Sequence, residues 1–459
     1  MHRIVNSAYA GAPIWTQNLT ISVAGWRKKR QRYGGVFNEI LDESLERTYA
    51  SREELVAYQK KRWDSAILPI LDQLPTYRDL DCSFEKISQL PILTKEELRR
   101  RIDDFRNPGW KTHKPIRMHT SGTTGAGLQF LLPAQSIQRQ WAYWWRYRYW
   151  HGIYMNEWCG VFGGREIVPA NQTEPPFWRI DHARRTVLFS QYHISPERGV
   201  RFLEEIASRQ LQWLHGYPSI LALIAKMGIE AGLAGTIPVK WITLGAEKLL
   251  THQRQAIEKM FNVSPLQHFG QAEAVANISE CEEGRLHVDE DFSIVEFISI
   301  PDERDSYRLI GSSLDNQAMP FIRYDTNDIV RLAAADECPC GRNGRVVREI
   351  DGRQEDFIVL SDNSMVGRLD HLFKDATNVV EAQIAQIEKG KATYRIVRGV
   401  NFTHRDEDDL REASFLRFGK RLDIEFEYLG KIPRTPRGKL QLVLNEMPVG
   451  QFEYSTKNI

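Results

Sequence analysis

The chain has 459 residues, of which 42% are hydrophobic and 26% are charged, and its 61 Lys and Arg against 60 Asp and Glu give a net charge of +1. At about 100–200 residues per domain this length predicts two to four folded units, and the composition excludes an intrinsically disordered chain. The charge balance argues against a nucleic-acid or membrane partner, and five cysteines in so long a chain exclude a disulfide framework. Because the sequence has no apolar run of about 20 residues and no signal-peptide pattern, we expect a cytoplasmic protein.

Helix start signals dominate the first hundred residues. Ser51 followed by Glu54 has the spacing of a capping box, and Thr94 with Glu97 repeats that spacing before a second helix. Apolar residues recur at helical spacing between 47 and 72. We therefore expect this region to be mostly helical.

The segment 136–150 combines many aromatic side chains with three arginines. Nucleic-acid bases could stack on the rings while Arg139, Arg146 and Arg148 contact phosphates. The alternative is a helix that is buried on most sides and whose arginines extend to solvent. We favour the buried helix, because the net charge is balanced and no nucleic-acid motif accompanies the segment.

From residue 157 onward, short apolar runs alternate with helical patterns. Strands are predicted at 159–162, 185–189, 213–215 and 241–244, and helices at 199–208, 220–230 and 252–261. This alternation predicts an α/β fold with a largely parallel sheet covered on both faces. Residues 294–300 and 306–310 are expected to pair as antiparallel strands, and the last hundred residues to form a small α+β unit.

The most informative local pattern is HTSGTTG at residues 119–125. Such a loop exposes backbone N–H groups and hydroxyls, which suit the oxygens of a polyphosphate. It is not a Walker loop, because no Gly-Lys-Ser/Thr closes it.

Six landmarks in chain order resemble those of the adenylate-forming superfamily, which includes acyl-CoA synthetases, peptide-synthetase adenylation domains and luciferase-type enzymes. They are HTSGTTG at 119–125, LGAEK at 244–248, FGQAE at 269–273, YDTND at 324–328, GRQEDFI at 352–358 and RTPRGK at 434–439. Within the superfamily the chain looks most like the phenylacetate–CoA ligase branch and its relatives from capsular-polysaccharide gene clusters. The narrower resemblance rests on Tyr58-Gln59 in a helical N-terminus, WLHGYPS at 213–219, and CxCGR after the aspartate motif.

This resemblance implies a large N-terminal domain at 1–353, helical over 1–115, and a small mobile lid at 354–459 with its hinge at Glu355. It implies that a carboxylic acid attacks ATP, giving an acyl-adenylate and pyrophosphate, and that the acyl group then passes to an acceptor. The phenylacetate-ligase resemblance favours CoA as the acceptor, whereas the capsule-cluster resemblance favours an amine. The expected partners are thus a small carboxylic acid and this acceptor, and a homodimer is left open.

The same resemblance assigns roles to single residues. Lys439 and Glu273 are the catalytic residues, Glu273 holds Mg²⁺, and Asp328 and Arg353 contact the ribose. The remaining ATP contacts are Thr120, Ser121, Gly122, Thr123, Thr124, Gly125, Gly245, Ala246, Glu247, Phe269, Gly270, Gln271 and Ala272. Tyr217 and His268 are candidates for contact with the acid, although His268 could equally be a buried histidine with its hydrogen bonds satisfied.

Three residues depart from the family pattern. Ala272 replaces the usual threonine, and Asp325 and Asn327 replace the arginine and glycine of the aspartate motif. A degenerate protein that binds ATP and acts as a scaffold therefore stays open as an alternative to an enzyme.

A second group of residues has the character of a metal site. Cys281, His287, Cys338 and Cys340 would supply three thiolates and one imidazole, which suit tetrahedral zinc, and related ligases carry the same arrangement. The alternative is reduced cysteines packed as small hydrophobes. A zinc-dependent nucleic-acid module is disfavoured by the charge balance, and Cys82 and Cys159 are expected to be plain thiols.

Overall fold

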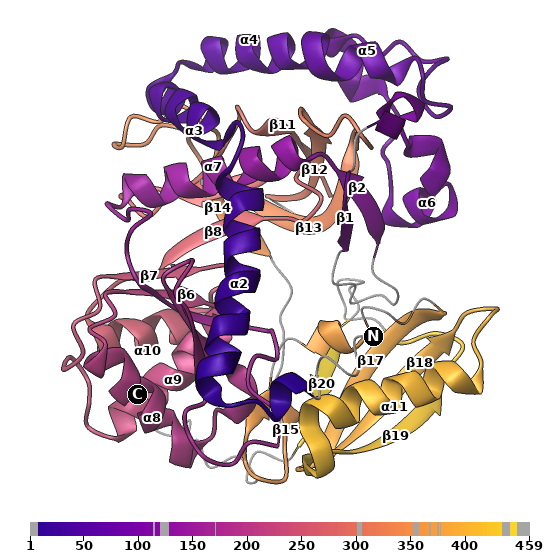
Figure 1. Cartoon of the computed structure of the whole chain (residues 1–459). Helices are drawn as coiled ribbons and strands as arrows, with labels where there is room; N and C mark the ends of the chain where they lie inside the picture. Colours follow the sequence, from indigo (N-terminus) through magenta and orange to yellow (C-terminus); the bar gives the residue numbers. More distant parts are fainter. Residues whose placement is uncertain are drawn as a thin grey trace.

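The structure is a computed structural model that describes residues 8–112, 115–119, 128–169, 171–300, 305–351, 358–366, 369–373, 376, 378–433 and 441–447 (Figure 1). A long mixed sheet forms the body of the molecule, and a four-stranded sheet with one long helix, both from residues 379–445, forms a separate layer. No helix in these ranges is long and apolar enough to cross a bilayer. The predicted α/β fold class is confirmed.

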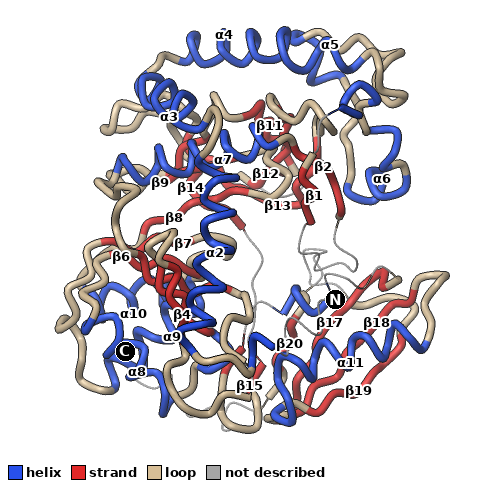
Figure 2. The backbone as a smooth tube through the Cα atoms, in the orientation of Figure 1, coloured by secondary structure: helices blue, strands red, loops and turns tan. Residues whose placement is uncertain are grey.

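The long sheet has twelve strands in the order β11-β12-β13-β14-β10-β9-β8-β7-β6-β3-β5-β4. Figure 2 shows this sheet as a continuous run of strands. Its parallel half consists of β3 (Cys159–Gly163), β5 (Thr186–Ser190), β6 (Trp213–Gly216), β7 (Trp241–Leu244) and β8 (Leu266–Gly270), with β4 (Trp178–Asp181) antiparallel at the edge. The predicted strands in this half are confirmed.

Helices cover both faces of the parallel half, as predicted. On one face lie α8 (Pro196–Ser208), α9 (Pro218–Glu230) and α10 (Thr251–Phe261); on the other lie α3 (Phe37–Glu46) and α7 (Ala134–Trp150). Successive strand residues alternate between these two layers: Leu214 packs in the α8–α10 core, and Trp213 packs in the α3–α7 core.

The antiparallel half contains β9 (Asn277–Glu280), β10 (Leu286–Val288), β11 (Ser293–Ser299), β12 (Ser306–Ser313), β13 (Tyr324–Leu332) and β14 (Val346–Asp351). The pairing of Ser299 with Tyr307 confirms the predicted antiparallel pair β11–β12. β8 is parallel to β7 and antiparallel to β9, so it joins the two halves.

The N-terminal region is helical, as predicted. It contains α2 (Ile14–Tyr33), α4 (Arg52–Arg62), α5 (Leu68–Leu71) and α6 (Lys95–Arg100). The capping box before α4 is confirmed, because the Glu54 backbone N–H donates to the Ser51 hydroxyl and the Ser51 N–H donates to the Glu54 carboxylate. Before α6 the Thr94 hydroxyl accepts from the Glu97 N–H.

Helix α7 corrects one detail of the prediction. The helix is buried on most sides, as expected, but Arg139, Arg146 and Arg148 do not extend to solvent and are all buried. Arg146 is held by two internal carboxylates, and Arg148 lies against the rings of three tryptophans. Burial is tolerable where a guanidinium finds such partners.

The C-terminal sheet has the order β19-β18-β17-β20, formed by β17 (Val379–Glu388), β18 (Lys391–Arg398), β19 (Asp423–Tyr428) and β20 (Val443–Asn445), with α11 (His404–Phe418) packed on it. Asp362 connects this unit to the large sheet, because it pairs with Arg421 at 3.3 Å and with Arg198 of α8 at 3.5 Å. The predicted domain boundary at 353/354 and the hinge Glu355 lie outside the described residues.

Candidate active site and metal cluster

The carboxyl ends of β7 and β8 open onto a cavity of about 210 Å³. In parallel sheets, loops that follow neighbouring strands meet at one edge, which is where ligands usually bind. Here the two loops carry the LGAEK and FGQAE motifs, and β13 brings Asp328 to the same place. The predicted residues that line the cavity are Gly245, Ala246, Glu247, His268, Phe269, Gly270, Gln271, Ala272, Glu273 and Asp328.

The backbone of these loops is held in uncommon conformations. Ala246 has φ +68° and Ala274 has φ +55°, so the turns after both strands pass through the left-handed region. Asn327 has φ +59°, which accounts for glycine at the corresponding place in the family motif. Asparagine is one of the few residues that adopt this conformation readily, so the replacement preserves the turn.

The two acidic residues predicted to meet the nucleotide are held by neighbouring side chains. The Tyr324 hydroxyl donates to Glu273 Oε1 at 3.3 Å, and the Gln271 amide donates to Asp328 Oδ2 at 3.2 Å. Glu247 accepts from the backbone N–H of Ser219 at 3.2 Å, near the N-terminus of α9. One oxygen of Glu247 thus stabilises a helix end, although Glu247 lines the cavity as Glu273 and Asp328 do.

His268 lies on β8 between two aromatic rings of α7, with ring centroids 5.4 Å from Trp144 and 5.3 Å from Tyr147. Burial, together with a smaller contribution from the charge of Arg148, lowers the pKa of His268 to about 3, so the imidazole is neutral at physiological pH. Its Nε2 is buried, and the side chain of Asn277 interacts with the imidazole ring. Both interpretations from the sequence, a contact with the acid and a buried histidine with its hydrogen bonds satisfied, therefore stay predictions.

Other predicted residues are not brought to the cavity or cannot be placed. Tyr217 packs against the core under α9 and is not among the residues that line the cavity. The phosphate-loop residues Thr120, Ser121, Gly122, Thr123, Thr124 and Gly125, together with Arg353 and Lys439, lie outside the described residues. The flanks of the loop are described: His119 at the end of β1 (Ile116–His119) pairs with Gln129 of β2 (Gln129–Leu132).

The cavity also has lining residues that the sequence did not single out. Lys95, Lys248, Thr326 and Ile350 are examples. Lys95 begins a helix that is distant in the sequence from every motif, so no local pattern could identify it. Lys248 and Thr326 lie inside the LGAEK and YDTND motifs. Their place in these motifs was a signal from which the sequence could have predicted that they line the cavity.

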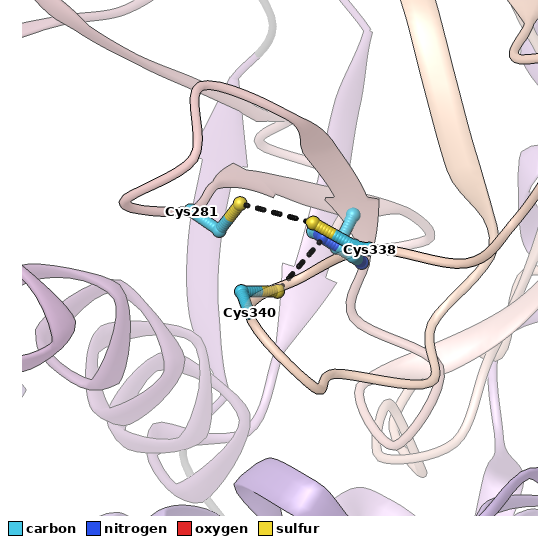
Figure 3. A group of neighbouring side chains, drawn as sticks. Cys281, Cys338 and Cys340 are labelled. Carbon is cyan, nitrogen blue, oxygen red and sulfur yellow. Dashed lines mark hydrogen bonds between the residues drawn. The ribbon is translucent and has the colours of Figure 1, made fainter.

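The four predicted metal ligands converge at the end of the β9–β10 hairpin. The ligand atoms of Cys281, His287, Cys338 and Cys340 all lie within 4.8 Å of one another. Figure 3 shows the three cysteine side chains directed toward a common centre. Cys281 Sγ is 3.8 Å from Cys338 Sγ, and Cys340 Sγ is 3.4 Å from His287 Nε2. Tetrahedral zinc with Zn–S bonds of about 2.3 Å separates two sulfurs by about 3.8 Å, so the geometry fits.

Neighbouring groups orient these ligands. His287 Nδ1 is 3.1 Å from the carbonyl oxygen of Gly344, which leaves Nε2 directed at the cysteines, an arrangement usual for a metal-bound imidazole. Burial raises the pKa of Cys281 to about 12. Burial alone would raise the pKa of Cys340 as well, but hydrogen bonds from Arg342 outweigh it and lower that pKa. A divalent cation would favour deprotonation of all three thiols.

The fold is shared with solved adenylate-forming ligases. A 2-hydroxyisobutyryl-CoA ligase in complex with 2-HIB-AMP and CoA superposes with a TM-score of 0.52 at 16% identity, covering 88% of this chain and 92% of that one. The same ligase in the postadenylation state with R3-HIB-AMP gives a TM-score of 0.51 at 16% identity, covering 87% and 91%.

Sequence comparison identifies one curated relative. Protein CapK of Staphylococcus aureus is 26% identical over 456 residues, which cover 97% of this chain and 100% of the relative. The family model described as the CapK C-terminal domain matches residues 358–446. The predicted resemblance to adenylate-forming ligases and their capsular-polysaccharide-cluster relatives is confirmed.

Proposed function

We propose that this protein uses ATP to activate a carboxylic acid as an acyl-adenylate, releases pyrophosphate, and then transfers the acyl group to CoA. The observation that carries the proposal is the cavity at the ends of β7 and β8, which Glu273 and Asp328 both line. It is supported by the shared fold, because the ligase structures with that fold hold acyl-AMP, and one of them also holds CoA.

Each predicted residue has a physical task in this reaction. Negative charge builds up as the α-phosphate is transferred, so catalysis depends on position and electrostatics. Glu273 would hold Mg²⁺, which shields the phosphate oxygens. Asp328 would accept hydrogen bonds from the ribose hydroxyls with Arg353 as support, and Lys439 would place its charge beside the carboxylate and the α-phosphate.

The remaining parts of the site complete this proposal. The 120–125 loop would donate N–H and hydroxyl groups to the β- and γ-phosphates. The neutral His268 would offer a ring nitrogen to the acid, because both a carboxylic acid and its activated form carry polar groups that need partners. Residues 354–459 would act as a lid that rotates between the two half-reactions, with the Arg198–Asp362 pair and the hydrogen bond from Arg421 to the Tyr192 carbonyl oxygen holding one orientation.

The departures from the family motifs bear on this proposal differently. Asp325 is buried and paired with Arg308, and Asn327 keeps the left-handed turn, so both serve the local fold of the motif. Ala272 lines the cavity and brings no hydroxyl to it, so one phosphate contact is missing. A scaffold that binds ATP without turnover is the alternative this residue keeps open.

We further propose that Cys281, His287, Cys338 and Cys340 hold one structural zinc ion. All four positions are taken by protein ligands, as in structural rather than catalytic zinc sites. The metal would tie the β9–β10 hairpin, which follows the Glu273 motif, to the chain that leads into β14. This connection would stiffen one wall of the cavity.

The experiment for the proposed function is hydroxylamine trapping with ATP, Mg²⁺ and a panel of aryl, fatty, amino and sugar acids. The quantity measured is the amount of pyrophosphate released with each acid. Release with one class of acid identifies the substrate class. Replacing hydroxylamine by CoA or by amines then distinguishes a thioester-forming ligase from an amide-forming one. ATP binding without pyrophosphate release for any acid would favour the scaffold.

A further inference from the structure

Helix α2 packs with its polar side toward the protein. The side-chain amide oxygen of Gln17 accepts from Arg179 Nε at 2.6 Å, and the Asn18 side chain accepts from the Ile180 backbone N–H at 3.0 Å. The Ser22 hydroxyl accepts from the His182 N–H at 3.1 Å and lies 3.4 Å from the Ile180 carbonyl oxygen, to which it donates. These side chains occupy the free edge of β4, the last strand of the long sheet.

Close packing fixes this orientation. A Cβ atom on Gly25 would lie 2.0 Å from Oδ2 of Asp181, so only glycine fits against the strand edge at this point. Asp181 is fully buried and paired with Arg184 at 2.6 Å. Because the polar face of α2 is bound in this way, the opposite face is directed to solvent.

That outer face is apolar. Trp15, Leu19, Val23 and Trp26 are 69%, 56%, 48% and 54% exposed. At about 100° per residue, their spacing places all four side chains within an arc of roughly 80°. A contiguous apolar stripe with two exposed tryptophans is uncommon on the surface of a soluble protein. Such a stripe marks a site of contact with another protein or with a membrane. We call these four residues the α2 stripe.

The charge of α2 accompanies the stripe. The helix contains Arg27, Lys28, Lys29, Arg30 and Arg32 but no Asp or Glu, and the first acidic residue after it is Glu39. Arg32 is directed inward, with its guanidinium 3.9 Å from the Trp141 ring. Arg27, Lys29 and Arg30 are exposed at the end of the stripe. The net charge of +1 for the whole chain therefore does not reveal the local excess of positive charge on α2.

We propose that α2 binds the surface of an anionic lipid bilayer, with the stripe in the interfacial layer and Arg27, Lys29 and Arg30 on the lipid phosphates. Tryptophan favours the membrane interface, and basic residues beside an apolar helix face add attraction to anionic headgroups. A second copy of the chain fits the face less well, because two such helices would bring their cations together without carboxylates of their own. The proposal is independent of the proposed enzymatic function.

The test is co-sedimentation of the full-length protein with vesicles of phosphatidylcholine alone or of phosphatidylcholine and phosphatidylglycerol in equal parts. We expect binding to the anionic vesicles, weaker at 0.5 M NaCl, and little binding to phosphatidylcholine. Trp15→Ser with Trp26→Ser should weaken binding at least about tenfold. Neutralising Arg27, Lys29 and Arg30 to glutamine should weaken it roughly a hundredfold.

Matched controls separate α2 from general surface effects. Phe415→Ser with Leu416→Ser removes two apolar side chains that are 59% and 54% exposed on α11. Arg201, Lys240 and Lys259 changed to glutamine remove three cations exposed elsewhere. Both controls should bind as the wild type does. Absence of binding to anionic vesicles, or equal loss in the controls, would overturn the proposal, as would a dimer that the tryptophan double variant dissociates while no vesicle binding is seen.

Discussion

The buried ion network around Arg146 makes the sharpest prediction about stability. Arg146 Nη2 is 2.6 Å from Asp289 Oδ1, and Nη1 is 2.8 Å from Asp291 Oδ2. The side chains of all three residues are at most 4% exposed. Asp289 also accepts from Asn277, whose amide oxygen accepts from Trp144 Nε1 at 3.0 Å. Trp144 packs on His268, so the network supports the candidate acid-binding wall.

Arg146→Met keeps most of the volume and removes the cation. Asp291 would retain Arg47, 3.2 Å from its carboxylate, whereas Asp289 would keep only neutral donors from Asn277 and Ser279. Removing one partner from a buried ion pair costs about 3–5 kcal/mol, because the remaining charge stays desolvated. We expect a loss of that size in the free energy of unfolding.

The loss should depend on pH. Burial already raises the pKa of Asp289 in the native protein, and removal of Arg146 would raise it further. Between the unfolded pKa of about 4 and this raised value, the folded state holds a proton that the unfolded state has released. Stability of the variant should therefore fall as the pH rises through this window, and the deficit should be smaller at pH 5 than at pH 8.

Urea denaturation at pH 5 and pH 8 measures both effects. Adding Asp289→Asn to the variant should restore most of the lost stability, because no uncompensated charge remains. Arg201→Met is the matched control, since its pair with Glu204 spans 3.7 Å on the surface and is screened by water. An equal, small loss for Arg146→Met at both pH values would refute the account of a desolvated charge.

Four further predictions concern the site. Asp328→Ala should weaken ATP binding at least about tenfold in calorimetry, since hydrogen bonds to a charged group contribute about 1.5–3 kcal/mol; an unchanged affinity would contradict the ribose contact. Lys439→Ala should abolish acid-dependent pyrophosphate release while ATP binding persists, and unchanged release would exclude its role. His287→Ala should lower the zinc content from about one ion per chain and reduce the melting temperature, whereas a metal-free wild type of equal stability would disprove the cluster. His268→Gln should make the fold less sensitive to acid between pH 7 and 5, because the folded pKa of about 3 lies below the unfolded value and wild-type stability falls as the pH drops; identical acid sensitivity would show that this histidine is not buried neutral.

Much of the architecture could be predicted because local signals agreed with the tertiary fold. The alternation of apolar runs and amphipathic segments identified the parallel strands and their helices, and Ser51 with Glu54 identified a helix start. The motifs at 244–248 and 269–273 follow adjacent parallel strands, so their convergence on one cavity follows from the topology.

The rest depended on contacts that sequence patterns do not reveal. The partners of Arg146 lie more than 140 residues away along the chain. Burial of this guanidinium requires those two carboxylates, and no local sequence pattern shows that they lie beside it. Helix α2 shows the converse case. Its polar residues bind a strand edge, so its apolar residues point outward, against the usual rule for an amphipathic helix.

The most direct test of the central claim is exchange of labelled pyrophosphate into ATP, measured with the wild type across the panel of acids. The account predicts exchange that requires one class of acid and Mg²⁺, and that disappears in Lys439→Ala and weakens in Asp328→Ala. Tight ATP binding without exchange for any acid, in the wild type and in a variant with Ala272→Thr, would contradict adenylation and leave the scaffold as the better description.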